Sequence, residues 1–289
     1  MNYPKISIVT PNYNKARYLE KTILSVLSQN YPNLEYIIID GGSTDGSVDI
    51  IKKYADQLTY WVSEPDNGMY YAIKKGFERS SGEIMAWIGS DDMYHSNSFF
   101  IVAQVFSECP EVSWIVGAQA SFDENSRTVK VESSPYFNHL NFLMHQFEWV
   151  QQESCFWRRS LYEQIGGIST DYKLAGDFDL WMRFSRHEKM YVIDALIGGF
   201  RHSEVQLSKN IDMYYQEVDC IITKEKVSNG ERKQIKKITR RFRIISMLKR
   251  LKIFNYHAMK SILLKKLVKE ELSHRLYFDF NRKKFVIYE

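Results

Sequence analysis

The sequence predicts an α/β fold built on a mostly parallel central sheet with flanking helices. Strand-like and helix-like segments alternate from residue 6 to residue 89. Several strand-like segments are almost continuously apolar, as parallel strands buried on both faces are. The chain of 289 residues, 44% of them hydrophobic, is long enough for one large domain, or for one domain with an appendage.

The first half of the chain predicts a regular order of strands and helices. Leu19, Ile23 and Val26 recur at helical spacing and identify the first helix. The expected elements are a strand at 6–10, a helix at 16–29, a strand at 35–40, a helix at 47–55, a strand at 59–63, a helix at 70–79 and a strand at 83–89. This order implies parallel strands joined by right-handed crossovers.

The second half has a mixed pattern. We expect strands at 112–117, 128–132 and 153–157 and a helix at 177–186, and from about Asn210 onward the chain becomes helical and basic. Residues 231–289 hold 18 Lys and Arg against 5 Asp and Glu, whereas the other 230 residues hold 21 against 30. The sequence therefore predicts an acidic body with a basic tail.

Cysteine usage and the N-terminus indicate the compartment. Cys109, Cys155 and Cys220 have no CxxC spacing, and an odd number cannot all pair within one chain, which favours a reducing compartment and argues against zinc. Residues 1–5 run straight into a strand, so no signal peptide is expected. No apolar run approaches the ~20 residues that cross a bilayer. These features predict a cytoplasmic protein, at most peripheral on a membrane.

Polar residues collect where the first four strands end. The four loops are 10–14, 40–46, 64–68 and 90–92. Ligands of open α/β sheets bind outside the carboxyl ends of the strands. The alternative is that these are ordinary Asp and Gly turn residues. Four such loops in register favour a ligand site across this edge.

The same loops exclude two common ways of binding phosphate. The loop from Pro11 to Lys15 has no glycine, so a GxGxxG dinucleotide fingerprint is absent, and so is a P-loop. An acidic edge needs a divalent cation between its carboxylates and a diphosphate, and Mg²⁺ and Mn²⁺ suit such oxygen ligands. Asp91 and Asp92, which follow a buried strand, are the natural place for it.

Five segments together resemble the family 2 glycosyltransferases of the GT-A fold. They are 6–46, 63–68, 87–92, 166–167 and 175–181, and the resemblance covers about residues 4 to 205. It implies a GT-A (Rossmann-like) fold with a C-terminal helical extension. The implied division is 1–118 for the nucleotide-sugar-binding half, 119–210 for the acceptor-binding and catalytic half, and 211–289 for the basic extension.

The resemblance also implies roles at the donor site. Asp40 would accept a hydrogen bond from a uracil imide, Asp91 would contact ribose, and Asp92 would bind Mn²⁺ or Mg²⁺ through the diphosphate. The motif here is Ser90-Asp91-Asp92 instead of a strict Asp-x-Asp, which leaves the division between the two carboxylates open. His202 is a candidate third metal ligand, the alternative being a structural role. The expected nucleotide contacts are Thr10, Pro11, Asn12, Tyr13, Asp40, Asp66 and Asp91.

Asp177 matches the catalytic base of the family. An inverting displacement needs a base that takes the proton of the acceptor hydroxyl, and such help is worth roughly 10²–10⁴-fold. Many relatives have Glu-Asp at this motif, whereas here Gly176 precedes Asp177. Asp179 would lie about 200° around the helix from Asp177, so the two cannot face one substrate. The alternative is that Asp177 is only a helix cap.

Three further residues are candidate sugar contacts. Gln151 and Gln152 precede an expected strand and are candidates for donor or acceptor contact, and Trp181 is a candidate for stacking on a pyranose. Core packing is the alternative for Trp181, as it is for Trp87 and Trp157.

The function expected from the resemblance is transfer of a sugar with inversion from an NDP-sugar, most simply a UDP-sugar. The acceptor would be a glycan or lipid-linked glycan in lipopolysaccharide or capsule synthesis. One rival is a sugar nucleotidyltransferase, which would need a Gly-rich basic loop after the first strand. Another is a nucleic-acid-binding protein that uses the tail, but no RRM, KH or zinc-finger pattern is present and the acidic edge stays unexplained. We expect no nucleic-acid partner.

The basic tail predicts a membrane partner independently of the resemblance. Residues 232–269 hold 14 Lys and Arg and no acid. Apolar residues recur at helical spacing at Ile235, Ile238, Phe242, Ile245, Leu248, Met259, Leu263 and Leu267. Basic amphipathic helices of this kind bind anionic lipid, which would hold the protein at the inner face of the cell membrane. The alternatives are that the apolar stripe packs on the body or mediates self-association.

Overall fold

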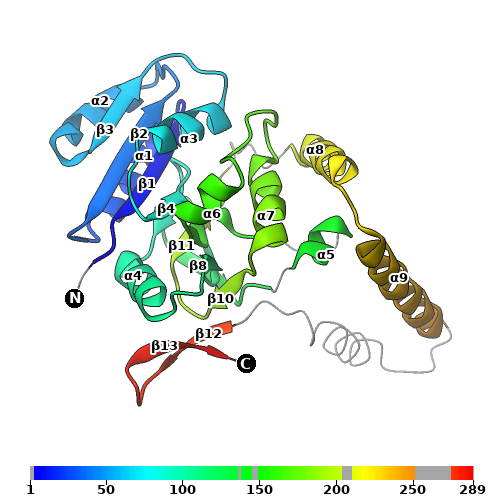
Figure 1. Ribbon diagram of the computed structural model, residues 1–289. Coiled ribbons are helices and arrows are strands. Elements are labelled where there is room, and N and C mark those ends of the chain that lie inside the picture. Colours follow the sequence, from blue (N-terminus) through cyan, green and yellow to red (C-terminus); the bar gives the residue numbers. More distant parts are fainter. Residues whose placement is uncertain (1–2, 136–137, 145–148, 204–209, 251–274, 289) are drawn as a thin grey trace.

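The computed structural model describes residues 3–135, 138–144, 149–203, 210–250 and 275–288. Within them, nine strands form the main sheet, which is mostly parallel; β9 and β13 run antiparallel to their neighbours (Figure 1). In sheet order the strands are β13 (Lys284–Tyr288), β12 (Arg275–Asp279), β10 (Tyr191–Ile193), β6 (Trp114–Val116), β9 (Cys155–Arg158), β4 (Ile84–Trp87), β1 (Ile6–Asn12), β2 (Leu34–Asp40) and β3 (Tyr60–Ser63). The predicted α/β fold is confirmed.

Helices flank this sheet, and a smaller sheet lies beside it. The helices of the body are α1 (Ala16–Leu27), α2 (Ser47–Lys53), α3 (Met69–Glu78), α4 (Ser98–Glu108), α5 (His139–Leu143), α6 (Arg159–Gln164) and α7 (Gly176–His187), with short 3₁₀ turns at Ala55–Gln57 and Gln152–Ser154. The small sheet has the order β5 (Met93–Tyr94), β11 (Gly198–Arg201), β7 (Gln119–Phe122) and β8 (Thr128–Glu132). The expected boundary at residue 118 falls between β6 and β7. The main sheet crosses this boundary, because β6 pairs with β9.

Four tryptophans form the centre of the core. Trp181 stacks between Trp87 and Trp114, with ring centroids 5.7 and 5.6 Å away, and Trp157 packs edge-on against it. All four are at most 2% exposed. Each large ring removes much apolar area from water, so this cluster fixes α7 against the sheet. The helix that carries Asp177 is therefore held by its own buried face.

The last strands differ from the expected helical extension. α8 (Ile211–Lys224) and α9 (Asn229–Arg250) are helical as predicted, but residues 275–288 form a hairpin that pairs with β10 and widens the main sheet. Leu276 and Phe285 are buried and explain why these residues join the sheet. The basic composition of the tail hid this short alternating pattern. Met259, Leu263 and Leu267 lie outside the described residues.

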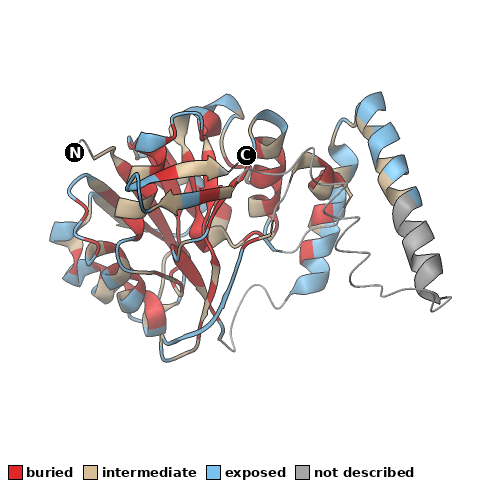
Figure 2. Cartoon of the chain, turned by 90° about the horizontal axis from the view of Figure 1, so that it is seen from below, coloured by how far each residue is buried: buried red, intermediate tan, exposed pale blue. Residues whose placement is uncertain are grey.

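The two C-terminal helices differ in how closely they contact the body. α8 buries Tyr214, Val218 and Ile221, whereas α9 extends away and is largely exposed along the part whose burial is shown (Figure 2). Ile235 and Ile238 at the start of α9 do pack against the core, as one of the alternatives for the tail stripe has it. Within the described residues, every helix is too short or too polar to cross a bilayer.

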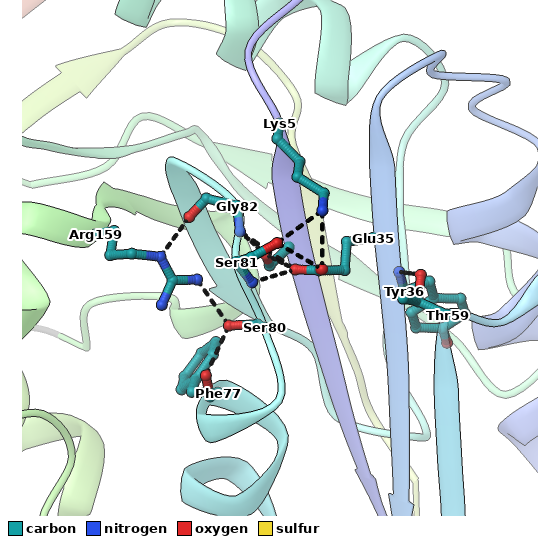
Figure 3. A network of polar contacts seen from close by, with 10 residues as sticks. Lys5, Glu35, Tyr36, Thr59, Phe77, Ser80, Ser81, Gly82 and Arg159 are labelled. Atoms are coloured by element: carbon teal, nitrogen blue, oxygen red, sulfur yellow. Dashed lines mark hydrogen bonds and ion pairs between the residues drawn. The ribbon is translucent and has the colours of Figure 1, made fainter.

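A buried carboxylate ties together the edge of the sheet where the parallel strands begin (Figure 3). Glu35 accepts hydrogen bonds from Ser7 Oγ at 2.5 Å and from the backbone N–H of Ser81 at 2.6 Å, and Lys5 Nζ lies 3.1 Å away. Arg159 braces the same loop by donating to Gly82 O and Ser80 Oγ. Burial opposes ionisation, but these hydrogen bonds outweigh it and hold the pKa of Glu35 at about 2.

Candidate active site

The opposite edge of the sheet, where β1 to β4 end, carries the predicted site residues. Strand register places Asn12 beside Asp40 and Asp40 beside Ser63, so these three side chains form a row across β1, β2 and β3. Asp40 is fully buried and accepts from Asn12 Nδ2, Ser43 Oγ and Ser63 Oγ, each at 2.6 Å. Burial opposes ionisation, but these bonds outweigh it and lower the pKa of Asp40 below its ordinary value.

The carboxylate of Asp40 is fully engaged by protein donors. The backbone N–H groups of Gly42 and Ser43 add two hydrogen bonds, at 3.2 and 2.9 Å. A carboxylate offers about four lone-pair positions, so five donors saturate it. Through these hydrogen bonds Asp40 holds the loop that follows β2 in place. A role in reading uracil would require one of these donors to yield.

Other candidate nucleotide contacts differ in accessibility. Thr10 and Pro11 are buried, and Thr10 Oγ1 lies 3.1 Å from Tyr36 Oη. Tyr13, by contrast, is 64% exposed just beyond the end of β1. Asp66 is exposed, and its carboxylate lies against Gly41, where an added Cβ would be 3.1 Å from Oδ2. Among the candidate nucleotide contacts, Tyr13 and Asp66 are therefore exposed to a ligand at this end.

In the turn after β4, the side chains of Asp91 and Asp92 point in different directions. A Cβ on Gly89 would lie 2.7 Å from Asp92 Oδ2, so only glycine leaves room for that carboxylate. Thr22 Oγ1 on α1 donates to the backbone carbonyl of Asp92 at 2.7 Å. Lys15 Nζ lies 2.7 Å from Asp91 Oδ2 and forms an ion pair with it. Asp91 thus faces the loop after β1, whereas Asp92 is 4% exposed and faces inward.

Two residues that the sequence pattern does not single out complete this turn. Arg201, which is fully buried at the end of β11, donates its backbone N–H to Asp92 Oδ1 at 2.8 Å and its Nε to Asp91 O at 2.5 Å. Glu153 is 7% exposed and hydrogen-bonds to the Asp92 side chain. The available signal was a lone acid shortly before the apolar stretch 155–157 and a lone arginine at the end of a short strand.

Electrostatics at Asp92 and Glu153 differ from those at Asp40. Burial, together with the nearby charges of Glu153 and Asp91, raises the pKa of Asp92 well above its ordinary value. Burial likewise raises the pKa of Glu153. Two carboxyl groups that share a buried space cannot both ionise without a compensating cation.

A divalent cation fits this set of donors. Asp91, Asp92 and Glu153 supply carboxylate oxygens, the ligands that Mg²⁺ and Mn²⁺ prefer. Lys15 and Arg201 set two positive charges against these three acids, so they compensate only part of the negative charge. Within the described ranges, no three His, Cys, Asp or Glu side chains are grouped so that they could hold a metal ion. That suits a cation held by one or two carboxylates and completed by a substrate diphosphate.

His202 follows Arg201 but projects away from it. Successive residues of a strand point to opposite faces, and the backbone N–H of His202 continues the ladder by donating to Phe122 O at 2.9 Å. Its Nε2 lies 3.2 Å from Ser121 Oγ, and its ring packs against Phe200. These contacts put the imidazole on the other side of the strand from the Arg201 guanidinium.

Asp177 lies in the first turn of α7, where Tyr70 from α3 meets it. Tyr70 Oη donates to Leu174 O at 2.9 Å and accepts from the backbone N–H of Asp177 at 3.2 Å. A Cβ on Gly176 would lie 2.8 Å from the Tyr70 ring, closer than such contacts come, and Tyr70 is itself buried. The aromatic ring of Tyr70 therefore leaves no room for a side chain at residue 176.

The carboxyl of Asp177 has the character of a proton acceptor. It is partly buried, and burial raises its pKa to about 6, against a hydrogen bond from the backbone N–H of Phe178 at 2.8 Å. Asp179 is engaged differently, because Arg183 Nη2 and Nε reach its Oδ2 at 2.6 and 2.9 Å. The charge of Asp177 also acts on Glu153, which places Asp177 and the Asp92 turn within electrostatic reach of one another.

The three candidate sugar contacts are engaged inside the protein. Gln151 donates to Ala120 O and accepts from Ala120 N, at 2.6 and 2.7 Å. Gln152 Nε2 donates to Trp87 O at 2.6 Å. Trp181 is 2% exposed and stacked within the core, which matches the packing alternative.

Comparisons with known proteins agree with this architecture. Residues 7–166, more than half of the chain, match the family described as Glycosyl transferase family 2. An uncharacterized glycosyltransferase of Mycobacterium tuberculosis is 30% identical over 184 residues, which cover 62% of this chain and 68% of that one. One of Rickettsia felis is 25% identical over 226 residues, covering 75% of this chain, and the match spans only 37% of that relative's length.

Solved structures share the fold. The S. aureus protein TarS, residues 1–349, in complex with UDP-GlcNAc superposes with a TM-score of 0.64 at 18% identity, over 80% of this chain and 70% of that one. The mannosyltransferase PcManGT from Pyrobaculum calidifontis, in complex with GDP-Man and Mn²⁺, gives 0.57 at 16% identity, over 81% and 68%. The GT-A fold and the glycosyltransferase domain expected from the sequence are confirmed. The chain belongs to glycosyl transferase family 2.

Proposed function

We propose that this protein transfers a sugar, with inversion, from a UDP-sugar to a hydroxyl of a glycan or lipid-linked glycan, with Asp177 as the base. One observation carries the proposal. Asp177, whose pKa is about 6, lies at the same edge of the sheet as the acidic Asp91–Asp92 turn. The UDP-GlcNAc complex of TarS supports a uridine donor, and the GDP-Man complex of PcManGT keeps GDP-sugars as the second candidate.

The residues of the chain divide the chemistry. Asp177 accepts the proton of the acceptor hydroxyl while the hydroxyl oxygen bonds to the anomeric carbon of the donor sugar. The bond from that carbon to the diphosphate breaks on the opposite face, and the diphosphate leaves with the electron pair. Asp92 and Asp91 would hold Mn²⁺ or Mg²⁺; His202, which points to the other side of its strand, would not reach this cation without a change of conformation. The cation, when bound, supplies positive charge that stabilises the departing diphosphate.

The donor contacts follow from the accessible edge. Tyr13 and Asp66 are exposed and would contact the nucleoside directly, while Asn12 and Asp40 shape the loop beneath it. Under this proposal residues 1–118 bind the donor and 119–210 supply the base and the acceptor side.

Screening a panel of UDP- and GDP-sugars for donor hydrolysis with Mn²⁺ or Mg²⁺ tests the donor and the metal together. We expect EDTA to abolish activity, either cation to restore it, and Asp92→Asn to lose donor binding measured by calorimetry. Full activity of metal-stripped protein would contradict the metal proposal. Hydrolysis of none of the donors would contradict the donor proposal.

We further propose that α9 holds the protein reversibly on the anionic inner face of the cell membrane. Four of the exposed basic residues of α9 support this: Lys233, Lys236, Lys237 and Arg240. Each basic residue near an anionic surface contributes about 1 kcal/mol. Because Ile235 and Ile238 pack on the body, the attraction from this part of the helix is electrostatic. It would bring the active site close to a lipid-linked acceptor.

Cosedimentation with phosphatidylglycerol and phosphatidylcholine vesicles across a salt series tests the membrane proposal. We expect binding to the anionic vesicles alone, lost at high salt and after the four basic residues are changed to Gln. Substitution is preferable to deletion of the tail, because β12 and β13 complete the main sheet. Equal recovery with both vesicles would remove the electrostatic claim.

A further inference from the structure

One acidic side chain of α8 binds the loop that leads into α7. Glu217 Oε2 accepts from the backbone N–H groups of Leu174 and Ala175, both at 2.8 Å, and its Oε1 accepts from that of Lys173 at 2.9 Å. Three consecutive amide groups therefore point at one carboxylate. Ala175 is the residue just before α7, and Asp177 follows two residues later. Figure 1 shows α8 beside this end of α7.

The loop is fixed from two directions. From α3, Tyr70 Oη binds Leu174 O and the backbone N–H of Asp177. From α8, Glu217 binds the amide groups of the same loop, including the N–H of Leu174. The first amide groups of a helix and the residues before it have no partners within the helix, so an external carboxylate is a strong anchor for them. Together the two contacts set where the first turn of α7 begins.

We propose that Glu217 is a positioning residue for Asp177, so that α8 belongs to the catalytic centre and is not merely part of the tail. The inference rests on the proposed function, in which Asp177 is the base. Residues 7–166 match the family, and Glu217 lies well beyond that segment. Its contact is with the loop backbone, so it acts through the placement of Asp177.

Placement of the base matters because proton transfer depends on distance. A shift of about 1 Å in a catalytic group lowers turnover by as much as 10²-fold. Glu217 also places a negative charge near Asp177, which favours the protonated form of that carboxyl. Loss of Glu217 should therefore affect both the geometry and the titration of the base.

Glu225 provides a matched control at the other end of the same helices. It pairs with Arg186 in the last turn of α7, so it ties α8 to α7 without touching the loop before Asp177. If Glu217 only docked α8 on the body, Glu225→Ala and Glu217→Ala would have the same consequences. If Glu217 positions the base, only its loss should alter the loop and the chemistry.

Hydrogen exchange of the apo protein tests the contact without any substrate. We expect peptides that contain residues 173–175 to exchange at least 10-fold faster in Glu217→Ala than in the unchanged protein. Glu217→Gln keeps one carbonyl oxygen and should fall between them, while Glu225→Ala should leave these peptides unchanged. Equal protection in Glu217→Ala and the unchanged protein would overturn the contact.

Kinetics with the donor that the panel selects, with Mn²⁺, tests the consequence. We expect Glu217→Ala to lower kcat about 10-fold or more with donor KM within about twofold, and Glu225→Ala to change neither. Glu217→Gln should keep most of kcat and move the acid limb of its pH profile to lower pH. A change in KM alone, or equal kcat for the two alanine variants, would overturn the inference.

The two failures are distinguishable. An active Asp177→Asn variant would sink the proposed base and leave the hydrogen-exchange result standing. An inactive Asp177→Asn variant beside a fully active Glu217→Ala variant would sink the positioning role alone. Melting temperatures of all variants, measured alongside, separate a misfolded protein from a misplaced base.

Discussion

The two edges of the main sheet hold buried carboxylates with opposite electrostatics. At the edge where the parallel strands begin, Glu35 is charged and its pKa is about 2. At the edge where they end, the pKa of Asp177 is about 6 and that of Asp92 is also raised. Burial is the largest influence on all three, so the difference lies in the donors around each group.

The number of donors separates a structural carboxylate from a reactive one. Glu35 receives hydrogen bonds from Ser7, Ser81 and Lys5, whereas Asp177 receives few, chiefly from Phe178 N–H. Asp40 lies at the functional edge yet belongs with Glu35, because five donors saturate it. Position at the edge of the sheet therefore does not by itself make an acid reactive.

The largest expected effect is on turnover, and it comes from replacing Asp177. Asp177→Asn should lower turnover by about 10²-fold or more with donor affinity nearly unchanged, because an amide cannot accept the proton. Steady-state kinetics and calorimetric donor binding measure the two quantities. NMR of the product should show the anomer opposite to that of the donor, and a retained anomer would rule out the inverting mechanism.

The same substitution should stabilise the fold. Because the folded-state pKa of Asp177 is raised to about 6, the folded protein binds more protons than the unfolded chain between pH 4 and 6, and stability falls as pH rises through that window. The loss is complete by about pH 7, one unit above the folded-state pKa. At that pH the free energy of unfolding of Asp177→Asn should be about 1–3 kcal/mol higher than that of the unchanged protein. Urea denaturation at pH 7.5 measures this, and a less stable variant would contradict the raised pKa.

The next effect tests the opposite edge. Glu35→Gln should lower the free energy of unfolding by about 3 kcal/mol at pH 7, because the folded-state pKa of Glu35 lies well below 4.5 and its charged form is the stabilised one. That stability is present above pH 4.5 and is lost as pH falls toward 2. The gap between the two proteins should therefore shrink as pH is lowered from 6 to 3.5. Catalytic turnover should not change.

The sequence predicted the fold of the first half well, because periodicity and continuous apolar strands report burial directly. The hairpin at 275–288 was missed since its alternating residues sit in a strongly basic tail. The sequence suggests candidate site residues where the signal is local, as at Asp40, Asp91–Asp92 and Asp177, which end expected strands or begin an expected helix. Partners from distant segments, such as Arg201, Glu153 and Tyr70, were not, because nothing in the chain marks which strand or helix lies opposite.

The smallest expected effect compares two acids in one helix. The pKa of Asp179 is also raised by burial, so a raised pKa alone does not identify the base. What differs is occupancy: Arg183 contacts Asp179 through two nitrogens and is anchored on Ile165 O and Gly167 O. Asp179→Asn keeps an oxygen that accepts from Arg183, so turnover in steady-state kinetics should stay within about threefold of that of the unchanged protein. If Asp179→Asn is instead the inactive variant and Asp177→Asn turns over normally, the base lies two residues further along α7, and the buried pair with Arg183 must open for substrate to reach it.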